Sequence, residues 1–196
     1  MPLLIIPVLV LIGVAVWVVM QYNFFVSTKA RVKAAVQEIG NQLKRQADLI
    51  PNLEESAKGY LKHEKGIFKD LAEARKTIAS AVKSGDVQKM SDAGSMVSAL
   101  IPNIQAVFES NPEIKGSEVV GKLMDELRDT ADKVMYSRRL VIDLTADYNV
   151  RRVSFPSNLV ASMFGMGELA GIATPQSGEH VEVGTSDLKT PKVKLE

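Results

Sequence analysis

An unbroken run of apolar residues opens the chain. Residues 3–20 carry no charge and no strongly polar side chain, and the uncharged stretch continues to Thr28. These eighteen residues would span roughly 27 Å as a helix, at about 1.5 Å each, which is close to the hydrocarbon thickness of a bilayer. Trp17 and Tyr22 favour an exit from the membrane near the end of the run. The pattern predicts a single-pass transmembrane helix, with residues 1–28 forming the anchor and its exit.

A cleaved signal peptide is the alternative for this segment, but neither a basic leading region nor a small-residue cleavage site is evident. The orientation of the anchor is inferred from the charges that flank it. Only the amino terminus precedes the span, whereas several basic residues follow it. These residues are Lys29, Arg31, Lys33, Lys44 and Arg45. Because basic residues concentrate on the cytoplasmic side, we expect the bulk of the protein to be cytoplasmic and the N-terminus to lie outside.

Beyond the anchor, apolar residues recur at helical spacing. The first set steps by four, three and four residues, which places its members on one face of a helix. Its members are Val32, Val36, Ile39 and Leu43. The same spacing continues in the segments 53–78, 86–109 and 120–148. No segment alternates between apolar and polar residues for long enough to indicate a strand, so residues 29–155 are predicted to form an all-α domain.

Turn signals separate the predicted helices. Gly85 stops one helix, and Ser84 or Asp86 is a candidate cap for the next. Pro and Gly bracket the segment NPEIKG at 111–116, which is typical of a turn. The tetrapeptide LIPN occurs at 49–52 and again at 100–103, but the flanking residues do not match, so the pair is not an internal repeat. The second copy is apolar on both sides and predicts a kink or local break within a helix.

The first LIPN copy predicts a helix boundary. Pro51 disfavours α geometry in the residue before it, and Asn52 with a glutamate three residues later matches a capping box. A kinked but continuous helix is the alternative. An apolar residue recurs every seven positions through the proline, at Leu43, Ile50 and Ala57.

Composition and charge exclude several classes of function. The chain has 24 basic and 23 acidic residues, so no basic excess supports nucleic-acid binding. Cysteine is absent, which excludes disulfides, thiolate metal ligands and cysteine nucleophiles. The two histidines, His63 and His180, are far apart, and His63-Glu64 lacks the second histidine of a zinc-binding helix. We predict no metal, no cofactor and no catalytic site.

Glu64 and Arg138 occupy positions on the predicted core faces of two helices. A buried charge is costly unless it has a partner, so one hypothesis is that the two side chains meet and fix helix register. The alternative is that each side chain reaches solvent at the edge of the core. Residues 156–172 are apolar and are predicted either to cover the bundle or to bind a partner, and residues 173–196 have the composition of a disordered tail.

Several motifs together resemble the LemA family. They are YN at 22–23, KRQADLIPNL at 44–53, GYLKHEK at 59–65, EAR at 73–75, NPEIK at 111–115, DYN at 147–149 and FPSNLVASMFG at 155–165. The motif positions of interest are Asp48, Pro51, Asn52, Tyr60, His63, Glu64, Arg75, Arg138, Tyr148, Asn149, Phe155 and Pro156. Gln46 stands where the family usually has a second arginine.

The resemblance implies a membrane anchor followed by an antiparallel, up-and-down four-helix bundle with left-handed twist. The family is widespread in bacteria, and the resemblance implies no particular activity. Some relatives carry a lipoprotein-type cysteine before the position of Tyr22, which would place their domain outside the cytoplasm, but this chain lacks that cysteine.

Three functions fit the sequence. The first, which we favour, is a non-catalytic, membrane-anchored scaffold that binds lipid through residues 3–20 and contacts a protein partner or a second copy. The second is an enzyme with an unrecognised carboxylate or tyrosine site. The third is a lipid-organising protein that uses the basic flank at 29–45.

Overall fold

The computed structural model describes residues 2–58, 65–112 and 116–173. Five helices follow one another within these ranges, and none of the described residues is in a strand. The helices are α1 (Pro2–Ala57), α2 (Lys65–Ser84), α3 (Val87–Ser110), α5 (Glu118–Val153) and α6 (Ser157–Met163). The prediction of an all-α protein is therefore confirmed for the described part of the chain.

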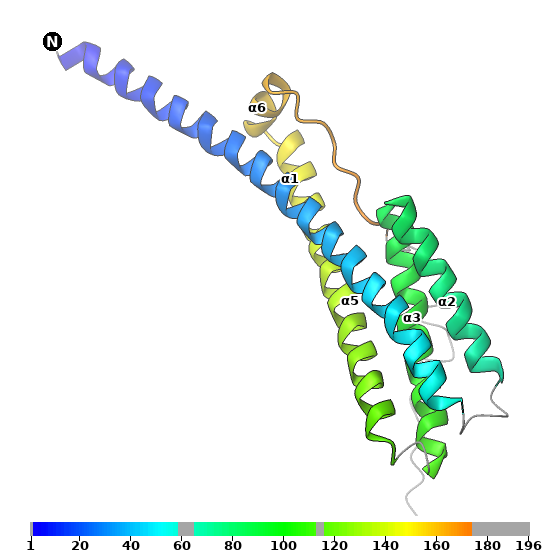
Figure 1. The fold of residues 1–196 in the computed structure, drawn as a ribbon. Helices are drawn as coiled ribbons and strands as arrows, with labels where there is room; N and C mark the ends of the chain where they lie inside the picture. Colours follow the sequence, from blue (N-terminus) through cyan, green and yellow to red (C-terminus); the bar gives the residue numbers. More distant parts are fainter. Residues whose placement is uncertain (1, 59–64, 113–115, 174–196) are drawn as a thin grey trace, which may run out of the picture.

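One very long helix organises the molecule (Figure 1). The second half of α1 lies against α2, α3 and α5, whereas its first part projects beyond them. α5 runs back along α1, because Phe25 contacts Tyr148 at one end and Arg45 pairs with Glu126 farther along. The short helix α6 follows α5 and lies beside α1 (Figure 1).

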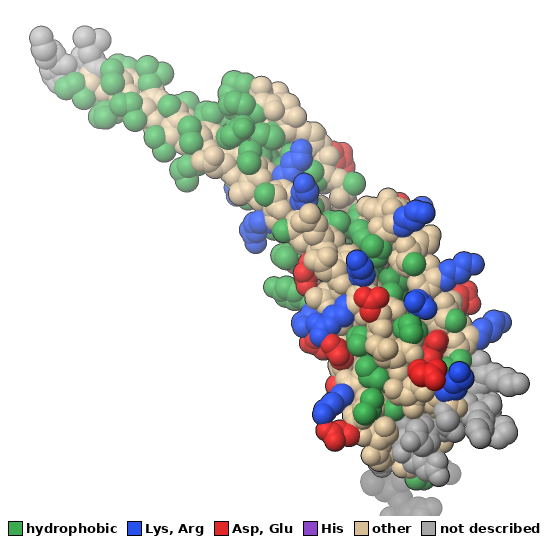
Figure 2. Space-filling view, viewed as in Figure 1, with side chains coloured by type: hydrophobic (Ala, Val, Ile, Leu, Met, Phe, Trp, Pro, Cys, Tyr) green, Lys and Arg blue, Asp and Glu red, His purple; other side chains and the backbone are tan. Residues whose placement is uncertain are grey.

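The projecting part of α1 is apolar on every side. Most of its large side chains between Ile5 and Met20 are exposed in the isolated chain, and its most apolar stretch has a mean hydropathy of 2.3. Figure 2 shows this part of α1 without charged side chains, while blue and red side chains gather over the rest of the molecule. We call residues 5–20 the apolar rod. Among the described residues, α1 is the one helix long and apolar enough to cross a membrane.

The core fills the space between α1, α2, α3 and α5. Apolar residues spaced three and four apart on each helix are buried there, as the periodicity predicts. Fully buried members include Ile39, Leu43, Ile50, Leu53, Leu71, Ile78, Ile104 and Leu127. This shared core holds four helices at fixed positions relative to the apolar rod.

The predicted helix boundary at Pro51 is wrong. α1 continues through this proline to Ala57, and Asn52 lies inside the helix with its side-chain amide 3.4 Å from the carbonyl oxygen of Asp48. Proline inside a helix costs about 3 kcal/mol. Burial of a large aliphatic side chain contributes about 1.5–3 kcal/mol, and Ile50 and Leu53 are both buried beside the proline. Keeping the buried face continuous therefore outweighs the local cost.

The predicted turn after α2 is confirmed in detail. Gly85 has a φ of +67°, and Asp86 caps α3 by accepting hydrogen bonds from the backbone N–H groups of Gln88 and Lys89 at 2.8 and 3.2 Å. At the second LIPN copy, α3 runs through Pro102 without a break. Residues 113–115, which are half of the other predicted turn, lie outside the described residues.

A glycine on α3 lies against a valine of α5 with no room for a side chain. A Cβ atom added at Gly94 would lie 2.6 Å from Cγ1 of Val134, well inside van der Waals contact. Valine has one strongly preferred rotamer in a helix, so this methyl group cannot turn aside at low cost. Gly121, on α5, has no atom within 4 Å of its equivalent position.

A polar side chain lies inside the core. Gln46 is fully buried, and neither its side-chain nitrogen nor its oxygen has a hydrogen-bond partner among the described residues. A buried amide without a partner costs about 1–3 kcal/mol relative to an apolar group of the same shape.

Gly94→Ala is expected to destabilise the protein by about 1–2 kcal/mol, because overpacking against Val134 exceeds the gain in helix propensity. Gly121→Ala is the matched control, and its open surroundings predict a gain of about 0.5–1 kcal/mol. Thermal unfolding followed by circular dichroism in detergent would compare the two variants. Equal effects would contradict the close approach of α3 and α5.

Gln46→Met is expected to raise the free energy of unfolding by about 1–2 kcal/mol, because it removes a buried amide and retains most of the side-chain volume. Gln37→Met, at an exposed position of the same helix, should change stability little. Chemical denaturation would measure both, and a loss of stability in Gln46→Met alone would show that the amide has a partner.

Candidate functional site

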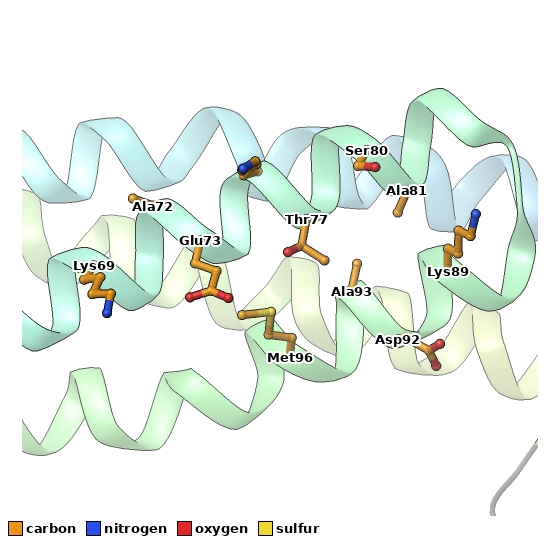
Figure 3. Close-up of a pocket in the computed structure, with 11 residues that line it drawn as sticks. Lys69, Ala72, Glu73, Thr77, Ser80, Ala81, Lys89, Asp92, Ala93 and Met96 are labelled. Carbon is orange, nitrogen blue, oxygen red and sulfur yellow. The ribbon is translucent and has the colours of Figure 1, made fainter.

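A groove of about 880 Å³ lies between α2 and α3 (Figure 3). Small side chains, among them Ala72, Ala81 and Ala93, leave this space open between the two helices. Charged groups of both signs also line it. They are Lys69, Lys76, Lys89, Glu73 and Asp92. The groove therefore combines a mainly apolar lining with charged groups of both signs.

The groove does not assemble a recognisable catalytic set. Figure 3 shows Glu73 and Asp92 at separate places along it, and the Asp92 carboxylate accepts a hydrogen bond from the Gln88 side chain at 2.9 Å. Within the described ranges, no three His, Asp or Glu residues are placed to hold a metal ion. His63 and His180 lie outside those ranges.

A second cluster forms where α5 and α6 meet α1, and we call it the junction. Its members are Phe24, Phe25, Tyr148, Ala161, Met166 and Leu169. The ring of Tyr148 is buried and meets Phe25 edge to face, with centroids 5.2 Å apart. The Arg151 guanidinium lies 3.8 Å from the centre of the Phe24 ring, in cation–π geometry.

Asn149 fixes the chain that follows α6. Its side-chain nitrogen donates to the carbonyl oxygen of Leu169 at 2.8 Å, and its oxygen accepts from the Leu169 backbone N–H at 3.0 Å. The nitrogen and the oxygen of the Asn149 amide therefore both bind the backbone of the same residue, Leu169. The segment then runs back along the helices to Ile172, which is buried, and to Ala173, whose N–H donates to the Gln88 side chain at 2.8 Å. Asn149 therefore holds the segment after α6 against α5.

The turn between α5 and α6 is compact. The Phe155–Pro156 peptide bond is cis, and Pro156 immediately precedes α6. The Ser157 hydroxyl donates to the carbonyl oxygen of Arg151 at 2.6 Å, which ties α6 to the last turn of α5. The Phe155 side chain is 82% exposed.

Burial raises the pKa of the Tyr148 phenol above its ordinary value, and the nearby positive charge of Arg152 partly offsets this rise. The phenol therefore stays protonated at neutral pH. With its ring packed on Phe25, Tyr148 acts as a packing residue in this cluster.

The family-motif residues fall into three groups. Tyr148 belongs to the junction, Asn149 binds the junction residue Leu169, and the Phe155–Pro156 pair lies in the turn before α6. The structure does not bring the others to this place. Asp48, Pro51 and Asn52 lie toward the far end of α1, and Arg75 is exposed on α2. Tyr60, His63 and Glu64 are outside the described residues.

Arg138 lies at the edge of the core. Its neighbour Ser137 is buried, whereas Arg138 is half-buried and donates to the Ser95 hydroxyl at 2.6 Å across the α3–α5 contact. Because Glu64 lies outside the described residues, the predicted pairing of Glu64 with Arg138 stays a prediction.

The sequence did not point to Phe24 and Phe25 as site residues, because they lie inside the uncharged run that predicts the anchor. The signal that could have found them is the heptad spacing of the buried face of α1, which continues back into the uncharged run. Phe25 lies seven residues before Val32, on the same face of α1, and both side chains are buried.

Two comparisons with known proteins complete the description. No curated protein matches the chain. The sequence model of the LemA family matches residues 35–184, a region that contains most of the motifs noted above and the helices α2, α3, α5 and α6. The chain therefore belongs to the LemA family.

Proposed function

We propose that the protein is a membrane-anchored, non-catalytic scaffold. Residues 3–20 would cross the bilayer, and the helices beyond them would present a surface to a protein partner or to a second copy. The observation that carries this proposal is the continuity of α1, which is one helix from the apolar rod to the core residue Ala57. A helix shared in this way would hold the domain at a set place beside the membrane.

The finer architecture is part of the proposal. We propose that α1, α2, α3 and α5 form an antiparallel, up-and-down four-helix bundle with left-handed twist. Cross-helix contacts support it: Gln105 bonds Arg128 and Ser95 bonds Arg138, so α3 and α5 run in opposite directions. The proposal places this bundle in the cytoplasm, because basic residues follow the span.

The α2–α3 groove is the part of the surface that we propose for partner contact. It combines a mainly apolar lining with charges of both signs, which suits an amphipathic protein segment. A lipid-organising role is the second candidate, and the stacking of Arg151 on Phe24 near the end of the apolar rod favours it.

Orientation can be tested cleanly because the chain has no cysteine. Ser84→Cys and Lys122→Cys introduce exposed thiols at two separate places on the domain. We expect a membrane-impermeant maleimide to label neither variant in intact cells and both after lysis. Labelling of both in intact cells would place the domain outside the cytoplasm and overturn the proposed orientation.

The groove can be tested by photo-crosslinking in cells. A photoreactive amino acid at Thr77, which is exposed and lines the groove, should give a discrete adduct larger than the 21.4 kDa chain. The matched control is Asp132, an exposed residue of α5 that does not line the groove. Equal adducts at both positions, or none at Thr77, would contradict a partner site in the groove.

A further inference from the structure

Apolar side chains are exposed around α6, and we call this patch the apolar cap. Its members are Val153, Phe155, Leu159, Met163 and Phe164. Phe155, Leu159 and Met163 are 82%, 60% and 65% exposed. The opposite face of α6, which includes Val160 and Ala161, is buried against the rest of the protein. A contiguous patch of this kind indicates contact with a membrane or a protein.

The cap lies beside the apolar rod. The Phe164 ring is 4.9 Å from the Tyr22 ring, centroid to centroid, and α6 contacts α1 directly. Figure 1 shows α6 next to the blue part of α1, away from α2 and α3. Figure 2 shows green side chains of both segments close together. The cap is therefore continuous with the surface that the proposed anchor offers to lipid.

Charged residues stop at one level on both segments. α1 carries no charge before Lys29, and residues 153–167 carry none either. On the other side of this boundary, Arg151 stacks on Phe24, and Arg152 lies 3.4 Å from the Glu168 carboxylate. Apolar surface on one side and arginine on the other is the order of groups across a membrane interface.

Helix length places the end of the hydrocarbon span near Tyr22, seven residues before the first charge of α1. A span that begins at residue 3 crosses a hydrocarbon core of about 30 Å in roughly 20 residues, and so ends near Tyr22. Phe164 packs at Tyr22, so the cap lies where the hydrocarbon would end. α6 has seven residues, about 10 Å, which suits a helix lying in the interface and is too short to span.

We propose that the apolar cap inserts into the bilayer interface as a second membrane contact beside the transmembrane helix. The occupant is lipid, with acyl chains against Leu159 and Met163 and anionic headgroups near Arg151. This inference rests on the proposed anchoring by α1. The other possible occupant is the cap of a second copy. Lipid is favoured because the cap continues the surface of the span and ends at the same charge boundary.

Tryptophan quenching tests the cap in the full-length protein. The chain has one tryptophan, Trp17, within the proposed span. In a Trp17→Phe background, Leu159→Trp and Met163→Trp place a reporter at two exposed cap positions, and Met135→Trp is the control at a 60% exposed position of α5 outside the cap. Each variant is reconstituted into vesicles whose lipids carry bromine either near the headgroups or near the chain ends.

We expect both cap reporters to lose emission in brominated vesicles, more strongly with bromine near the headgroups, and the Met135→Trp reporter to keep its emission. In the unaltered protein, quenching of Trp17 reports on the anchor alone, so it separates this inference from the anchoring proposal. Loss of emission from Trp17 with none from either cap reporter would leave the anchor in place and overturn the inserted cap. Blue-shifted, unquenched cap reporters would assign the cap to a protein contact instead and also overturn it. Absence of quenching at Trp17 would overturn the anchor itself.

Discussion

Packing of α1 on α5 is the contact on which the rest of the structure depends. It is the most extensive helix–helix contact in the described chain, and it extends from the Phe25–Tyr148 pair to the Arg45–Glu126 pair. α3 then packs on α5 across Gly94, and α2 packs on α1 and α3. Because α5 reaches back to the level of Phe24, it also brings α6 to the apolar rod. The α1–α5 contact therefore determines both the core and the surface near the proposed membrane.

Helical periodicity was sufficient to predict the class of fold and most of the helices, since each helix buries a face with a regular repeat. Local rules failed where distant burial outweighed them. Pro51 and Asn52 match a boundary locally, yet the buried residues around them belong to one seven-residue repeat. At Arg138 the prediction differs from the structure by one position, since Ser137 is the buried residue and a helical face is broad enough to include both. Asn149 could be recognised as a motif residue, but its partner Leu169 is twenty positions away.

The motif residues that meet at the junction have structural roles. Tyr148 packs, Asn149 clamps a backbone segment, and Ser157 closes the turn before α6. Together these contacts hold the apolar cap beside the rod. Gln46 is a contrasting case, because its polar group is buried among apolar residues and its amide has no partner in the described part of the chain.

The unbroken course of α1 also has a rotational consequence. Successive residues of a helix turn by about 100° around its axis, so the direction that the span faces fixes the direction that the groove faces. Adding one residue between Met20 and Val32 would turn the domain by that angle relative to the span. The junction opposes such a turn, because α5 and α6 contact α1 on both sides of the charge boundary. A twist of the proposed span would therefore be transmitted to the whole domain as a rotation about the axis of α1.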